Sequence, residues 1–176
     1  MAGPAWEQLK NAADQATGRP DLSNQDTTVN TTVLAKALVF ARTGEAPYRQ
    51  EVVAALTTLI DEKSEEKGRT LALGRELVAY VVAADLIDLR TYDPSLNQRF
   101  EARLRELLTK PIYGWGAEPK SLRDTHEERP NNWGTHAGAS RAAIALYLGD
   151  DAELERTAQV FHGYLGDRTS YNSFEY

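Results

Sequence analysis

Cysteine is absent from this chain of 176 residues, and histidine occurs only three times. Without cysteine the protein has no disulfides and no thiol chemistry, although this alone does not fix the compartment in which it works. The histidines, at positions 126, 136 and 162, lack the helical spacing of a metal site and have no carboxylate arranged beside them, so we expect no metal ion. Phosphate-cradling glycine loops and nucleophile elbows are missing as well.

Long apolar runs are also missing. No stretch of the sequence is long enough to span a bilayer, and we therefore expect no membrane partner. The residues after Met1 lack the charged and apolar regions of a signal peptide, although a removed signal would leave no trace. The formal net charge of −6 argues against a broad basic surface for nucleic acid.

The pattern that the chain does contain is helical. Apolar residues at 33, 34, 37, 38 and 41 follow the helical period, and a glycine at position 44 then marks a stop. Similar segments joined by short polar turns occur along the chain and leave no convincing strand. They predict helices from Pro4 to near Gly18, from the threonines before Val33 to Thr43, from Pro47 to Ile60, from Thr70 to Leu89, from Pro94 to Leu108, from Asn132 to Leu148 and from Asp150 to Leu165.

The predicted fold is therefore all-α. Antiparallel helical hairpins are either stacked as a bundle or curved into a partial, incomplete α/α toroid. The length fits a single domain over residues 1–176, and no repeat of fixed period points to an ordinary solenoid.

The helix predicted over 70–89 is apolar on nearly every side, which is typical of a helix buried all round. Arg75, Tyr80 and Asp85 are its polar exceptions. A buried guanidinium needs a partner or a water-filled cavity, so Arg75 is either a structural ion-pair residue or a ligand for substrate. Tyr80 is expected in the core.

Residues 110–129 read as a long irregular connection, and loops of this length in compact domains are often functional. Tyr113 and Trp115 in this stretch form either an aromatic platform for a sugar ring or a contact that packs the loop onto the body. His126 is expected to be a solvated loop residue.

The stretch over 129–141 brings amide, imidazole, indole and guanidinium groups together at a probable helix start. Pro130 discourages helix before it, and Asn132 is a good N-cap candidate. Steps of four lead from Asn132 to His136 and Ser140, which places the three on one face. Because this small, polar end leads into an apolar helix, we expect it to face a cleft.

Several segments together resemble polysaccharide lyases of the alginate-lyase-like family, and the resemblance spans most of the chain. The specific part is Asn-Asn-Trp-Gly-Thr-His at residues 131–136. The other segments are 34–38, 70–75, 83–87 and 165–168.

The resemblance implies an incomplete α/α toroid whose inner helices line a groove for an acidic polysaccharide substrate. It implies cleavage by β-elimination with no oxidising cofactor, and a secreted or periplasmic location. Domains of this family continue well beyond residue 167, so we expect the chain to hold only the first part of one, truncated at its C-terminal end. A half-toroid exposes apolar helix faces, which favours a homodimer or association with a missing C-terminal segment.

The chemistry of such a reaction gives the residues their expected roles. Removing the C5 proton of a uronate builds charge on the adjacent carboxylate, which must be neutralised while a base accepts the proton and an acid protonates the leaving oxygen. Asn131 or Asn132 can donate to the carboxylate, and His136 can support it or act as the base. An arginine would complete a clamp, and Arg141 and Arg168 are equal candidates beside Arg75, although either could instead form a surface ion pair.

Other roles in this site stay open at this point. Trp133 is either a wedge between helices or, like Trp115, a contact for a sugar ring. The resemblance also implies a catalytic tyrosine that serves as acid or base. Tyr164 and Tyr171 follow the Asn/His block, but neither lies in a motif that identifies it as that tyrosine.

Two other functions compete with the lyase. One is a helical module that binds an acidic sugar or another protein without turning it over. A glycoside hydrolase on a similar helical toroid would need two carboxylates across the sugar bond. The sequence offers Asp85, Asp124, Glu127 and Glu128 for that purpose.

Overall fold

The computed structural model describes residues 3–113 and 118–174. Within these ranges the protein has only helices and two isolated β-bridges, so the predicted all-α class is confirmed. The elements are α1 (Pro4–Ala13), α2 (Val29–Thr43), α3 (Ala46–Asp61), the 3-10 helix η1 (Ser64–Lys67), α4 (Thr70–Leu86), α5 (Leu89–Tyr92), α6 (Pro94–Thr109), α7 (Leu122–Glu128), α8 (Asn132–Leu148) and α9 (Asp151–Tyr164).

The α2–α3 hairpin forms where the sequence predicts it. Gly44 adopts a φ of +73°, the left-handed conformation that ends many helices, and its N–H bonds to the carbonyl of Phe40. Pro47 then lies in the first turn of α3, where its missing N–H costs nothing.

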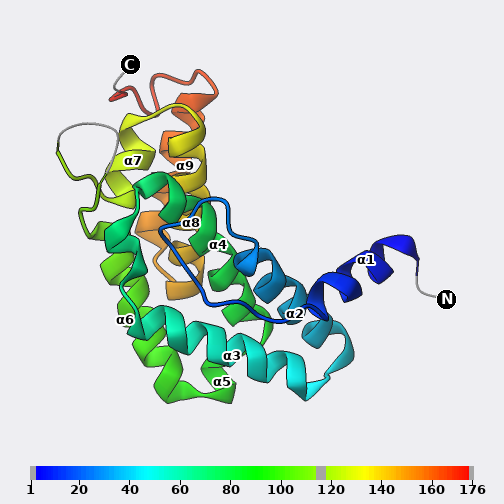
Figure 1. Ribbon diagram of the computed structural model, residues 1–176. Helices are drawn as coiled ribbons and strands as arrows, with labels where there is room; N and C mark the ends of the chain where they lie inside the picture. Colours follow the sequence, from blue (N-terminus) through cyan, green and yellow to red (C-terminus); the bar gives the residue numbers. More distant parts are fainter. Residues whose placement is uncertain (1–2, 114–117, 175–176) are drawn as a thin grey trace.

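Helix α4 lies in the middle of the fold and packs against α2, α3, α7 and α8 (Figure 1). Its most extensive neighbour is α8, while α6 and α9 lie on the outside and α1 projects from the rest of the chain. The core between these helices is almost entirely aliphatic, with Phe100 and Tyr147 in edge-to-face contact. The central pair α4 and α8 is therefore the frame on which any site is held.

Helices α4 and α8 run in the same direction. Near the start of both, Gly74 of α4 lies against Ala137 of α8. Near their ends, Val81 and Asp85 of α4 line one pocket with Tyr147 of α8. The N-terminal ends of both helices therefore point to the same end of the molecule, which favours negative charge there.

Two helix ends and one additional helix differ from the sequence prediction. The first helix ends at Ala13 rather than near Gly18, and α4 ends at Leu86 because Asp88 takes a φ of +50° and interrupts the path into α5. The stretch expected to be irregular contains α7. Ser121 and Asp124 start it as a capping box, in which each side chain bonds to the other's backbone N–H.

None of the helices within the described ranges is long and apolar enough to cross a membrane. The same part of the chain contains no group of three side chains arranged to hold a metal ion.

Candidate active site

The start of α8 is fixed by Asn131, which is the N-cap that the sequence prediction assigned to Asn132. The Asn131 side-chain oxygen accepts from the backbone N–H of Trp133 at 2.9 Å. Asn132 is consequently the first residue of the helix. Its side chain is exposed and makes no hydrogen bond within the described residues, so its amide is available to a ligand.

The packing of α4 on α8 places the next residue of the site. A Cβ on Gly74 would lie 2.8 Å from the backbone nitrogen of Ala137, so only glycine allows the two helices this close. The buried hydroxyl of Ser140 donates to the carbonyl of Gly74 at 2.7 Å and fixes the register. Ser140 thus serves the helix contact, while His136, one turn earlier, lies beside α4.

Arg75 follows Gly74, and its side chain is exposed, although the sequence pattern predicted a buried guanidinium. Its guanidinium has no carboxylate partner within the described residues, so it is not a structural ion-pair residue. Its charge reaches His136, whose pKa is lowered first by partial burial and second by Arg75. The imidazole is therefore held neutral, as a base for a carbon-bound proton must be.

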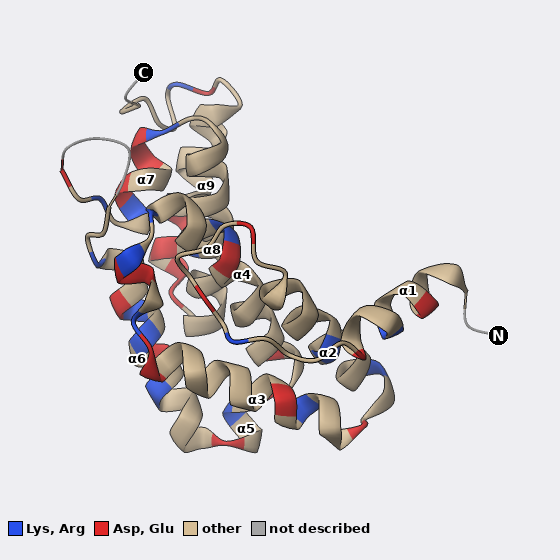
Figure 2. Cartoon of the chain, in the orientation of Figure 1, with Lys and Arg blue, Asp and Glu red and all other residues tan. Residues whose placement is uncertain are grey.

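Arg75 belongs to a group of three exposed cations that precede and enter α4. Lys67, Arg69 and Arg75 make no ion pair within residues 3–113 and 118–174. Most of the other Lys and Arg side chains lie against carboxylates, as the alternating charges along α6 illustrate (Figure 2). These three side chains therefore add positive charge near the start of α4 that no ion pair among the described residues offsets.

Arg141 lies elsewhere and corrects a prediction. Its side chain is 0% exposed and pairs with Glu153 at 2.6 Å and with Glu127 at 3.0 Å. A third contact, at 3.3 Å, joins it to Nδ1 of His126. Buried charges need such partners, and a residue enclosed in this way is no clamp for a substrate carboxylate.

The prediction that His126 is a solvated loop residue is wrong. The residue lies in α7 and its side chain is buried. Its ring lies against Gly138, and the guanidinium of Arg141 donates to its Nδ1. Burial and the charge of Arg141 lower its pKa to about 3. Its role is to join α7 to α8.

The two tyrosines predicted as acid or base are held in structural contacts. The Tyr164 hydroxyl donates to the carbonyls of His126 and Arg129, and burial raises its pKa. It lies against Gly134, which is two residues from His136 and so on the opposite face of α8. Tyr171 is buried with its ring under Arg156. Neither hydroxyl lies with Asn132 and His136.

Two tryptophans, Trp133 and Trp115, are candidates for contact with a sugar ring, and the structure describes the first of them. Trp133 is half-buried in the first turn of α8. The predicted sugar contact at Trp115 lies outside the described residues.

The carboxylates required by a hydrolase are already in use. Asp124 caps α7, Glu127 pairs with Arg156 and Arg141, and Glu128 pairs with Lys120 at 2.6 Å. Asp85 is exposed but lies near the far ends of α4 and α8, beside Tyr147. Asp85 shares a small pocket of about 90 Å³ with Asp88 at that end, so the structure does not bring it together with the three carboxylates of α7 that the sequence offered to a hydrolase.

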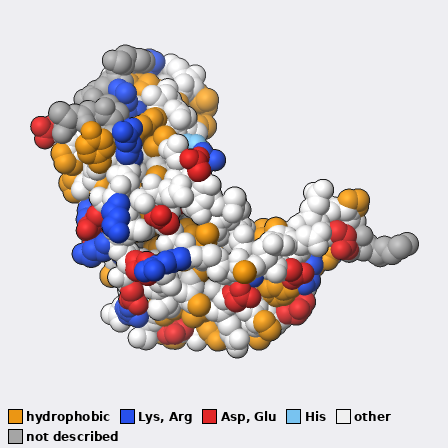
Figure 3. All heavy atoms as spheres, in the orientation of Figure 1, with side chains coloured by type: hydrophobic (Ala, Val, Ile, Leu, Met, Phe, Trp, Pro, Cys, Tyr) orange, Lys and Arg blue, Asp and Glu red, His pale blue; other side chains and the backbone are white. Residues whose placement is uncertain are grey.

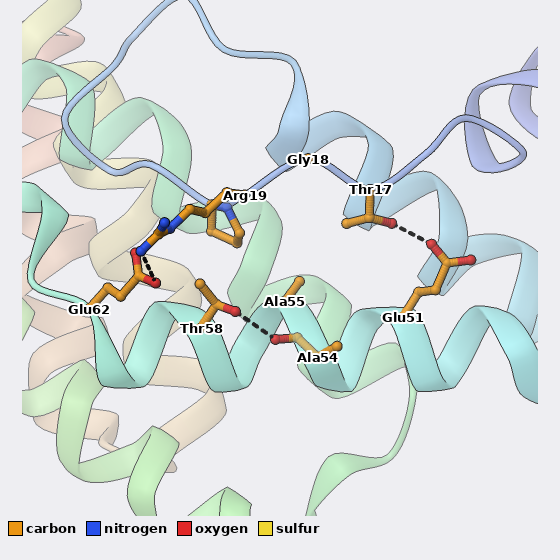
Figure 4. A pocket seen from close by; sticks show the side chains of 9 residues that line it. Thr17, Gly18, Arg19, Glu51, Ala54, Ala55, Thr58 and Glu62 are labelled. Atoms are coloured by element: carbon orange, nitrogen blue, oxygen red, sulfur yellow. Dashed lines mark hydrogen bonds and ion pairs between the residues drawn. The ribbon is translucent and has the colours of Figure 1, made fainter.

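A pocket of about 470 Å³ lies between residues 17–20 and α3, away from α8 (Figure 4). Its charged side chains are already satisfied. Arg19 makes two bonds to Glu62, and Glu51 accepts from Thr17 at 2.6 Å. Because the pocket has no unpaired group to offer a ligand, the residues around His136 remain the better candidate site.

Comparison with known proteins identifies the family of this chain. A family model described as alginate lyase matches residues 33–168, which cover most of the chain and include α4 and α8. The chain belongs to the alginate lyase family, and the resemblance seen in the sequence is confirmed. No curated protein and no solved structure matches it.

Proposed function

We propose that this protein is a lyase that cleaves a uronate-containing polysaccharide by β-elimination at the start of α8. The observation that supports this most is the convergence of three groups from two helices. Asn132 offers a free amide, His136 a neutral imidazole, and Arg75 an unpaired guanidinium. These are the donor, base and cation that the reaction needs.

In the proposed reaction the substrate carboxylate lies between Arg75 and Asn132, whose N–H groups donate to it. His136 takes the C5 proton, the electron pair forms the C4–C5 double bond, and the C4–O bond breaks. The leaving oxygen must receive a proton. Because Tyr164 and Tyr171 are committed to other contacts, the protonated His136 returns the proton when both groups leave from the same sugar face.

The parallel arrangement of α4 and α8 supports binding of an acidic chain at this end. Two helix N-termini add partial positive charge to that of Lys67, Arg69 and Arg75. The layering, with α4 and α8 inside α6 and α9 (Figure 1), is the arrangement expected of a partial α/α toroid, which we propose as the architecture. A secreted or periplasmic location would bring such a site to extracellular polymers.

A second function, binding without turnover, is favoured by one observation. Both candidate acid or base tyrosines are committed to structural contacts. A protein with the same clamp but no effective acid would retain polyuronate and release no product.

Incubation with polymannuronate, polyguluronate, polyglucuronate and polygalacturonate separates these functions. We expect ultraviolet absorbance to rise with at least one polymer, because elimination places a double bond in conjugation with the carboxylate. Asn132→Ala should reduce the rate roughly 10- to 1,000-fold, the usual cost of one donor to developing negative charge. Release of reducing sugar without absorbance would instead show hydrolysis, and retention of polymer with neither signal would show a binding module.

A further inference from the structure

Tyr113 and Arg69 form a second exposed pair at the same end of α4. The backbone of Tyr113 bridges to that of Arg69, and its carbonyl accepts from the N–H of Thr70 at 3.0 Å. The Arg69 guanidinium carbon lies 5.5 Å from the centre of the Tyr113 ring. Two segments that are far apart in sequence, the start of α4 and the residues after α6, are thus held together by main-chain contacts.

The side chains of this pair are open to solvent. Tyr113 is 57% exposed, more than expected of an aromatic residue whose role is to pack a loop onto the body. Arg69 has no carboxylate partner among the described residues, so its N–H donors are unused. The surface in Figure 3 shows basic side chains beside hydrophobic ones where the start of α4 and the residues after α6 lie.

We propose that Arg69 and Tyr113 form a binding subsite for one uronate unit of the substrate, separate from the unit that is cleaved. This rests on the proposed function. The free face of the tyrosine ring receives the apolar face of the sugar, and the guanidinium, oriented by the ring, donates to the sugar's carboxylate. A ring combined with an unpaired guanidinium is selective for acidic sugars over neutral ones.

The position along α4 indicates which sugar unit the subsite holds. Arg69 precedes Arg75 by six residues, which corresponds to about 9 Å along a helix. Arg75 and His136 act on the unit that loses its proton, so Arg69 and Tyr113 hold a neighbouring unit of the same chain. The subsite therefore contributes to affinity for longer polymers rather than to the chemical step.

Affinity electrophoresis tests the proposal without relying on turnover. The native protein is run in gels containing polymannuronate, polyguluronate, polyglucuronate or polygalacturonate, with dextran as the neutral polymer. We expect a polyuronate, but not dextran, to retard the wild type. Tyr113→Ala and Arg69→Gln should each bind about tenfold more weakly, roughly one lost contact, whereas Tyr113→Phe should bind as the wild type.

The chain contains a matched control. Arg49 lies 3.9 Å from the ring of Tyr92, which is 43% exposed, at the other end of the molecule. Tyr92→Ala removes a similar stacked pair and should leave retardation unchanged. Binding by Tyr113→Ala equal to that of the wild type would overturn the subsite. Weaker retardation of Tyr113→Ala than of the wild type, with no product from either, would contradict the lyase function but support the subsite. No retardation of the wild type by any polymer would overturn the subsite.

Discussion

Replacement of His136 by glutamine should lower turnover of a polyuronate about 100- to 10,000-fold with a small change in KM. Glutamine keeps a polar side chain of similar reach but does not accept the proton from C5. The half-buried imidazole, with its pKa lowered by burial and by Arg75, is the neutral base in our account. The measurement is the rate of increase in ultraviolet absorbance at saturating polymer.

The pH dependence of the same assay adds a second readout. Measured at low polymer concentration, where kcat/KM reports the free protein, activity should rise with pH as His136 loses its proton, with a midpoint below about 6.5, the ordinary value for histidine. His162, exposed on α9, offers the matched control, and His162→Gln should retain wild-type rates. Undiminished turnover in His136→Gln would remove this residue from the mechanism.

Replacement of Glu76 by glutamine should stabilise the protein at alkaline pH. Glu76 is 1% exposed, and neither of its carboxylate oxygens has a hydrogen-bond partner among the described residues. Burial raises its pKa to about 7. The nearby charge of Arg75 opposes the rise, and those of Asp21 and Asp26 add to it. The folded protein therefore holds this carboxyl in its neutral form when an unfolded chain would have ionised it.

The sign of the effect follows from the two pKa values. An unfolded glutamate loses its proton near pH 4.5 and the folded one near 7, so the wild type loses stability as pH rises through this window. At about 1.4 kcal/mol per pKa unit, the total loss is about 3 kcal/mol. Glutamine does not ionise, so Glu76→Gln should be about 3 kcal/mol more stable than the wild type at pH 8 and nearly equal to it at pH 4.

Urea unfolding of both proteins between pH 4 and 8 measures this difference. Tyr80, one turn further along α4, is also buried without a partner for its hydroxyl, and it stays neutral throughout this range because burial raises its pKa. Glu155, exposed on α9, provides the control. Glu155→Gln should show no pH-dependent gain. A constant difference between Glu76→Gln and the wild type at all pH values would show that Glu76 titrates normally in the folded protein.

Much of the fold was predictable because its signals are local. Gly44 and Pro47 mark the turn between α2 and α3, and Pro94 marks the start of α6, where Asp93 caps the helix. Such residues act on backbone groups within a few positions, so a single sequence shows them. Ser121 and Asp124 carry the signature of a capping box, which is the local signal for α7. The glycines and prolines that precede it are typical of a loop, so the sequence prediction lacks this helix.

The partners of charged side chains were less predictable, because periodicity does not say which helix covers which face. Arg75 lies on a helix that is apolar on nearly every side and yet is exposed, while Arg141 in the middle of α8 is fully buried. The close contact at Gly74 turns one face of α4 onto α8, whereas α7 and α9 enclose Arg141 with His126, Glu127 and Glu153. The sequence offered Arg75 and His136 as separate candidates, and the structure shows that the charge of Arg75 acts on His136.

In the proposed mechanism, Arg75 and His136 form one site for the carboxylate of an acidic sugar. The most direct test is the pKa of His136, measured by NMR with the three histidines assigned from His→Gln variants. The ligand is a methyl uronoside, which carries the carboxylate but no sugar at C4 to leave. We predict a pKa below the ordinary value in the free protein, an upward shift on adding the uronoside but not a methyl glucoside, and a higher starting value in Arg75→Gln. A His136 pKa that responds neither to the uronoside nor to the loss of Arg75 would contradict the account.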